Sequence, residues 1–95
     1  MERTPQNLAI RRRELAQEYK SKMEELAEIK KRKAIDVIKL LDEHKTVAKA
    51  KLYYEATDDG QKEIEIELYS RGLLELMRSV KTEIEILNAE AHNNY

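Results

Sequence analysis

The feature that most constrains the fold of this chain is the absence of chain-breaking residues over more than half of its length. Between Pro5 and Gly60 there is neither a glycine nor a proline, and only Gly72 follows. These two residue types most often mark turns and the ends of helices and strands. The sequence therefore predicts very few turns and argues against a loop-rich fold or a many-stranded sheet.

The first predicted element is a helix over about residues 5–55. Thr4 can cap its start, and Pro5 suits the first helical position, where its missing N–H is not needed. Apolar residues recur every eleven positions, as at Leu15, Leu26 and Val37. Eleven residues make three helical turns, so these side chains share one face.

The second predicted element is a helix over about residues 58–90, after a turn at about 56–60. Thr57 can cap it, and Asp58 and Asp59 in its first turn complement the helix dipole. We expect the polar tail 91–95 to fray. The predicted fold class is therefore all-α: a long antiparallel helical hairpin, coiled-coil-like, forming a single domain over residues 1–95.

Each predicted helix has an apolar stripe wider than one antiparallel neighbour can cover. A chain of 95 residues is also small enough to need oligomerisation for stability. We therefore predict a homodimer that forms a four-helix bundle. The residues predicted to form the core and the oligomer interface are Leu15, Tyr19, Met23, Leu26, Val37, Leu41, Leu73, Met77, Val80, Ile84 and Leu87.

An alternative fold places a β-hairpin between two helices. Residues 62–69 alternate between polar and apolar types, Asp59 and Gly60 suit a hairpin turn, and residues 52–54 could form the partner strand. Against it, Glu and Lys are poor strand residues, and a lone hairpin is marginally stable. Gly72 indicates either a close helix–helix contact or a point where a helix restarts.

The charges are distributed unevenly along a chain whose net charge is −1. Residues 1–54 contain 14 Lys and Arg against 9 Asp and Glu, whereas residues 55–95 contain 4 against 10. Mutual attraction between two antiparallel segments explains this asymmetry. A basic surface for nucleic acid is the alternative explanation.

No pattern typical of catalysis or of metal or cofactor binding is present. Cysteine is absent, and the two histidines, His44 and His92, belong to no metal-binding or catalytic motif. We therefore expect no enzymatic activity, no cofactor and no small-molecule substrate. The start of the chain is polar and no stretch approaches the roughly 20 apolar residues of a membrane span, so we expect no membrane partner and a cytoplasmic protein.

Two basic runs are candidate nucleic-acid contacts. They consist of Arg11, Arg12 and Arg13, and of Lys30, Lys31, Arg32 and Lys33. Consecutive residues of a helix spread around its whole circumference, and no aromatic residues are interleaved with these runs. Nucleic-acid binding is therefore possible but not favoured.

A candidate partner-docking tip lies around the predicted turn. It consists of Tyr53, Tyr54, Asp58, Asp59 and Tyr69. Tyrosine is favoured at protein interfaces because it combines a large apolar area with a polar end. The same tyrosines could instead form a small core that closes the turn.

The second half of the chain resembles a known group of proteins. The stretch 54–61, Tyr-Glu-Ala-Thr-Asp-Asp-Gly-Gln, followed by Ile64, Tyr69, Lys81 and the ending 88–95, is similar to small uncharacterised helical proteins encoded in phage and prophage early regions. The resemblance implies an adaptor or inhibitor of a host or phage protein, acting against host defence or in recombination, in a bacterial cell. The alternatives are a nucleic-acid accessory protein and a purely structural coiled-coil spacer.

Overall fold

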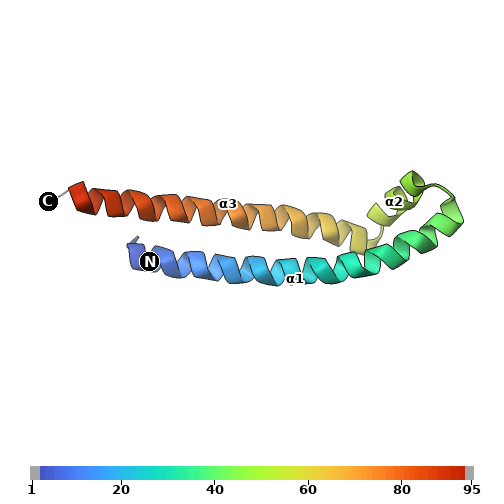
Figure 1. The fold of residues 1–95 in the computed structure, drawn as a ribbon, viewed down its shortest axis with the longest axis horizontal. Helices are drawn as coiled ribbons and strands as arrows, with labels where there is room; N and C mark the ends of the chain where they lie inside the picture. Colours follow the sequence, from blue (N-terminus) through green and yellow to red (C-terminus); the bar gives the residue numbers. More distant parts are fainter. Residues whose placement is uncertain (1–2, 94–95) are drawn as a thin grey trace. The chain divides into compact units, whose positions relative to one another are not determined.

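The computed structural model describes residues 3–93, and this part of the chain forms three α-helices. They are α1 (Pro5–His44), α2 (Val47–Glu55) and α3 (Asp58–Asn93) (Figure 1). No strand occurs in the described residues, so the predicted all-α class is confirmed and the β-hairpin alternative is wrong. Glu and Lys favour a helix strongly enough to override the short alternating pattern at residues 62–69.

The predicted start of the first helix is confirmed. The backbone N–H of Asn7 donates a hydrogen bond to Thr4 Oγ1 at 3.1 Å, and Pro5 is the first helical residue. The hydroxyl of Thr4 thus satisfies one of the donors that a helix start leaves free.

The first helix differs from the prediction because it ends at His44, not at about residue 55. Lys45 has a φ of 60°, and its N–H donates to the carbonyl of Leu41 at 2.8 Å, which is an αL cap. Thr46 then caps α2, with its side chain accepting from the N–H of Lys49 at 3.2 Å. One left-handed residue therefore ends a helix that no Gly or Pro interrupts, and a threonine cap begins the next helix.

The turn between α2 and α3 consists of Ala56 and Thr57 alone. Thr57 Oγ1 accepts a hydrogen bond from the N–H of Gly60 at 3.1 Å, so the predicted cap is confirmed. The same hydroxyl donates to the carbonyl of Tyr54 at 2.6 Å. A Cβ on Gly60 would lie 2.7 Å from Glu55 Cα and closer still to the carbonyl oxygen of Tyr54. This turn therefore requires glycine at position 60.

The second long helix continues further than predicted. Residues 91–93 belong to α3, whereas we expected fraying from residue 91; residues 94 and 95 lie outside the described residues. Gly72 is neither a close contact nor a restart, because α3 continues through it and a Cβ there would meet nothing within 4 Å.

The contacts of the chain group into two compact units, where one domain was predicted. Unit 1 comprises residues 1–21 and 70–95, and unit 2 comprises residues 22–69. In unit 1, the first part of α1 lies beside the last part of α3, and Arg3 Nη1 lies 2.9 Å from Glu83 Oε1. Leu8, Leu15 and Leu73 are buried in this unit.

Unit 2 contains the second part of α1, all of α2 and the start of α3. Leu26 and Ile29 of α1 and Ile66 of α3 form its hydrophobic cluster, against which Met23 packs. Ala50 and Tyr54 are the buried residues of α2. The break at Lys45 therefore lets the short helix α2 reverse direction and bury Ala50 and Tyr54, which a continuous helix could not do.

Candidate interaction surface

The second basic run is largely neutralised by acidic residues of α3. Arg32 forms a two-pronged pair with Asp59, with Nε–Oδ2 at 3.0 Å and Nη2–Oδ1 at 3.3 Å. Lys33 Nζ lies 3.2 Å from Glu63 Oε1, and Lys30 Nζ lies 3.7 Å from Glu67 Oε1.

The fourth residue of this run, Lys31, pairs with Glu28 within α1 at 3.1 Å. Three of the four basic residues thus pair with acidic residues of α3, as the predicted attraction between the basic and acidic segments requires. Phosphate would have to compete with these carboxylates, which weakens the nucleic-acid interpretation.

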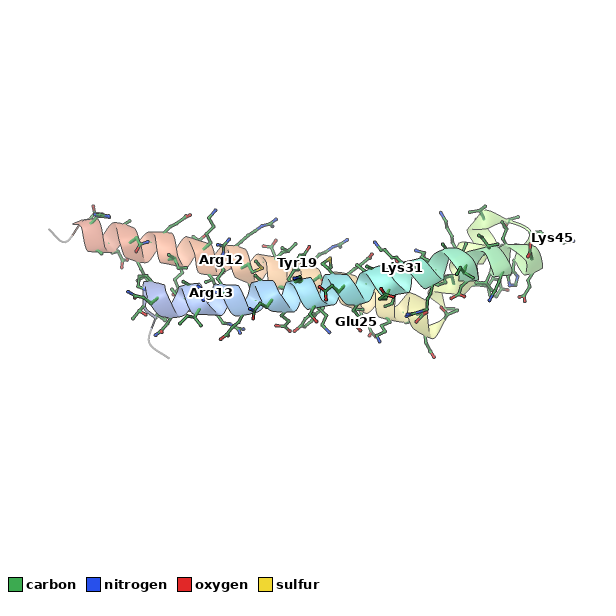
Figure 2. All side chains as sticks on the ribbon, turned by 60° about the horizontal axis from the view of Figure 1, so that its bottom comes forward. Arg12, Arg13, Tyr19, Glu25, Lys31 and Lys45 are labelled. Carbon is green, nitrogen blue, oxygen red and sulfur yellow. The ribbon has the colours of Figure 1, made fainter. Side chains whose placement is uncertain are left out.

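The first basic run lies in unit 1 on the N-terminal part of α1 (Figure 2). Arg11 pairs with Glu14 at 3.6 Å. Arg12 and Arg13 line a hollow of about 450 Å³ together with Ala9, Ala16, Met77 and Ile84. Neither of these two arginines forms an ion pair with a described residue.

The five residues of the predicted docking tip do not share one exposed surface. Tyr54 is only 1% exposed, and its ring lies 5.3 Å from Lys33 Nζ. It therefore belongs to the core of unit 2, and the prediction that it contacts a partner is wrong. Burial raises the pKa of its phenol, and the nearby carboxylates of Glu63, Asp59 and Asp36 raise it further.

The other tip residues are accessible but have intramolecular neighbours. Tyr53 stacks on His44 with ring centroids 3.8 Å apart and an interplanar angle of 6°. Tyr69 is exposed, with Lys22 Nζ 5.4 Å from its ring.

The two aspartates of the tip differ in their surroundings. The hydrogen bond from Arg32 lowers the pKa of Asp59. Asp58 is exposed and, with Asp59, Asp36, Lys39, Leu40 and Thr57, lines a hollow of about 370 Å³. Asp58 and Asp59 thus remain accessible at this hollow, and Tyr53 and Tyr69 remain accessible outside it.

The residues predicted for the core and interface divide into two classes. Leu15, Leu26 and Leu73 are buried. The half-buried ones are Tyr19, Met23, Val37, Leu41, Met77, Val80, Ile84 and Leu87. Their partial exposure leaves apolar area on both units that the chain itself does not cover.

Sequence reasoning missed several core residues. Ile29 is 1% exposed, and its position three residues after Leu26 was a signal that could have identified it. Glu63 and Ser70 are also buried, although both are polar. For Glu63 the reason is its ion pair with Lys33, which only the folded structure reveals.

Large apolar side chains face outward along all three helices. Those that are exposed, by 42% to 67%, are Ile10, Ile35, Ile38, Val47, Leu52, Tyr53, Ile64, Leu68, Tyr69, Leu76 and Ile86. Single exposed apolar residues need no explanation, but contiguous ones indicate interaction sites.

The described residues provide neither a membrane span nor a metal site. None of the helices there combines the length and the apolar composition that crossing a bilayer requires. No group of three or more His, Cys, Asp or Glu residues in residues 3–93 is arranged to hold a metal ion.

The chain was also compared with known proteins. No model of a protein family matches it, and neither a curated protein nor a solved structure does. The similarity to phage early-region proteins therefore remains a prediction from the sequence.

Proposed function

We propose that this chain is a non-enzymatic protein-interaction module that works as a homodimer and docks on another protein. The observation that supports the proposal is that more large apolar side chains are exposed than apolar residues are buried. The described residues include eleven large exposed ones, more than the eight apolar residues that are buried. A second protein surface would remove this area from water, at roughly 25 cal/mol for each Å² buried.

The docking surface that we assign to the partner is the exposed side of α2 and the adjoining turn. Val47, Leu52 and Tyr53 expose apolar area on α2, and the exposed Asp58 adds negative charge at the start of α3, directly after the turn. As the phage resemblance implies, the bound partner would be a host or phage protein, with this chain acting as adaptor or inhibitor.

The mass of the protein in solution tests the homodimer. We expect sedimentation or light scattering to give about twice the 11.2 kDa of the chain, and a melting temperature that rises with protein concentration. A mass of one chain, with melting independent of concentration, would contradict the dimer.

The partner-docking part is tested by capture from a bacterial lysate. Leu52→Asp should reduce capture and leave the dimer mass unchanged, and Ile86→Asp in unit 1 is the matched control. Equal capture by both variants would contradict docking through α2.

The two alternative functions give different results in these tests. A nucleic-acid accessory protein would bind DNA or RNA at low salt and release it as salt rises. The residues that remain candidate nucleic-acid contacts are Arg12 and Arg13, because the ion pairs of residues 30–33 compete with phosphate. A structural spacer would dimerise and capture nothing.

A further inference from the structure

A groove in unit 2 combines an apolar floor with a rim of lysines. All three helices contribute to it, and its volume is about 460 Å³. The residues that line it are Lys30, Lys33, Ala34 and Val37 of α1, Lys51 of α2 and Glu63 of α3.

The rim is positively charged even after its internal ion pairs are counted. Lys33 is held by Glu63 at 3.2 Å, and Lys30 is more loosely paired with Glu67 at 3.7 Å. Lys51 is exposed and forms no ion pair with any residue of the described part of the chain. Three lysines against Glu63 and Glu67 leave one uncompensated positive charge, on Lys51, which favours a negatively charged occupant.

The floor of the groove continues as an apolar stripe along α1. Ala34, Val37, Ile38 and Leu41 stand at positions i, i+3, i+4 and i+7, so they share one face of the helix. Ala34 and Ile38 are exposed, and Val37 and Leu41 are half-buried. Such a stripe beside a second helix is the surface on which an amphipathic helix packs its own apolar face.

We propose that this groove binds an amphipathic helix of another protein whose apolar stripe is flanked by Glu or Asp. This inference rests on the proposed protein-interaction function. It extends the docking surface from α2 to the groove that Lys51 of the same helix lines, and it names the chemistry of the partner. The apolar stripe of this helix packs on the floor, while one of its carboxylates pairs with Lys51. A phosphate backbone suits the groove less well, because it has no apolar face to cover the floor.

The test uses two labelled synthetic helices of about 18 residues, or five turns. Both have Leu at positions i, i+3, i+4 and i+7 of each stripe; one has Glu at the flanking positions and the other has Lys. Fluorescence anisotropy measures their affinity for the full-length protein. We expect the acidic peptide to bind at least about tenfold more tightly at low salt, with the difference shrinking as salt rises.

Matched variants locate the site. Lys51→Glu should weaken the acidic peptide by about tenfold, because it reverses one rim charge. Lys49→Glu makes the same charge change on α2 outside the groove and should have little effect. Ile38→Asp should abolish binding, whereas Ile10→Asp in unit 1 should not.

The peptide and variant experiments can contradict the inference in four different ways. Equal binding of both peptides would overturn the acidic partner and leave the protein-interaction function standing. Binding of neither would overturn the inference, while the solution mass and lysate capture still decide the proposed function. Equal losses for Lys51→Glu and Lys49→Glu would show a non-specific charge effect. If Lys51→Glu halves the mass of the protein alone, the occupant is a second copy and the proposed partner is wrong.

Discussion

The phenol of Tyr54 is buried in unit 2, and its hydroxyl has no hydrogen-bond partner among the described residues. A buried hydroxyl without a partner is destabilising because it has lost its bonds to water. Its ring, by contrast, contributes apolar area to the core and lies under Lys33. Removing the hydroxyl and keeping the ring should therefore stabilise the fold.

We expect Tyr54→Phe to raise the free energy of unfolding by roughly 1 kcal/mol at pH 7. The raised pKa of Tyr54 means that the native state keeps its proton above pH 10, where the unfolded chain has lost it. Wild-type stability should therefore fall as pH rises above about 10, and less steeply in the variant. Urea unfolding at pH 7 and pH 11 measures both effects.

The control for this prediction is Tyr53→Phe, because Tyr53 is exposed and should leave stability unchanged. A loss of stability in Tyr54→Phe would show that the hydroxyl is hydrogen-bonded in solution.

Substitution by alanine should have opposite effects on stability at the two glycines. Gly60→Ala places a Cβ against the backbone of Tyr54 and Glu55, so the turn must shift, and we expect a loss of roughly 1–3 kcal/mol. Gly72→Ala meets nothing within 4 Å and should gain about 1 kcal/mol from the higher helix propensity of alanine.

Thermal or urea unfolding of both glycine variants measures these effects at one protein concentration. A destabilising Gly72→Ala would mean that a partner surface approaches α3 closely at this position.

At the scale of elements, the short helix α2 depends on one backbone position. Lys45 has a φ of 60°, a conformation that costs a non-glycine residue roughly 1–3 kcal/mol. It lies at the bend between α1 and α2 (Figure 2). Glycine at this position would keep the αL cap and remove the strain.

We therefore expect Lys45→Gly to raise the free energy of unfolding by about 1 kcal/mol. Lys39→Gly, inside α1 on an exposed position, should lower it by about 1 kcal/mol. Chemical unfolding followed by circular dichroism distinguishes them. Destabilisation of both variants would indicate that α1 continues through residue 45 in solution, as the sequence predicted.

At the scale of the whole molecule, ion pairs between helices add pH dependence to the fold. The hydrogen bond from Arg32 lowers the pKa of Asp59, and the hydrogen bond from Lys62 lowers that of Glu25. Lowered pKa values mean that the unfolded state binds protons first as pH falls. The stabilisation is therefore present above the ordinary values near pH 4 and is lost as pH falls through the lower native values.

We expect the free energy of unfolding to decrease between pH 5 and pH 3, and the decrease to be smaller in Asp59→Asn. Asp42→Asn is the control, because Asp42 is exposed and in no ion pair among residues 3–93. Urea titrations at fixed protein concentration provide the measurement. An unchanged slope in Asp59→Asn would show that the pair with Arg32 is not formed in solution.

Much of the fold follows from local chemistry that the sequence displays. Thr4 and Thr57 have side chains that cap a helix start wherever the chain permits one, so both starts were predicted. The helical class follows from the near absence of Gly and Pro together with abundant Glu, Lys, Leu and Ala. The attraction between a basic first part and an acidic second part was likewise readable from charge alone.

The rest depends on contacts between residues distant in the sequence. Whether the chain bends at Lys45 depends on the burial of Ala50 and Tyr54 in unit 2, which offsets the strain of one left-handed residue. The same burial removes Tyr54 from the predicted docking tip, and the pairing of α1 with α3 occupies most of the charges at residues 30–33. Helix propensity and capping act within a few residues, so the sequence is enough to predict them. Burial and ion pairing act between helices that are distant in the sequence, so the side chains that stay available for a partner are known only from the folded chain.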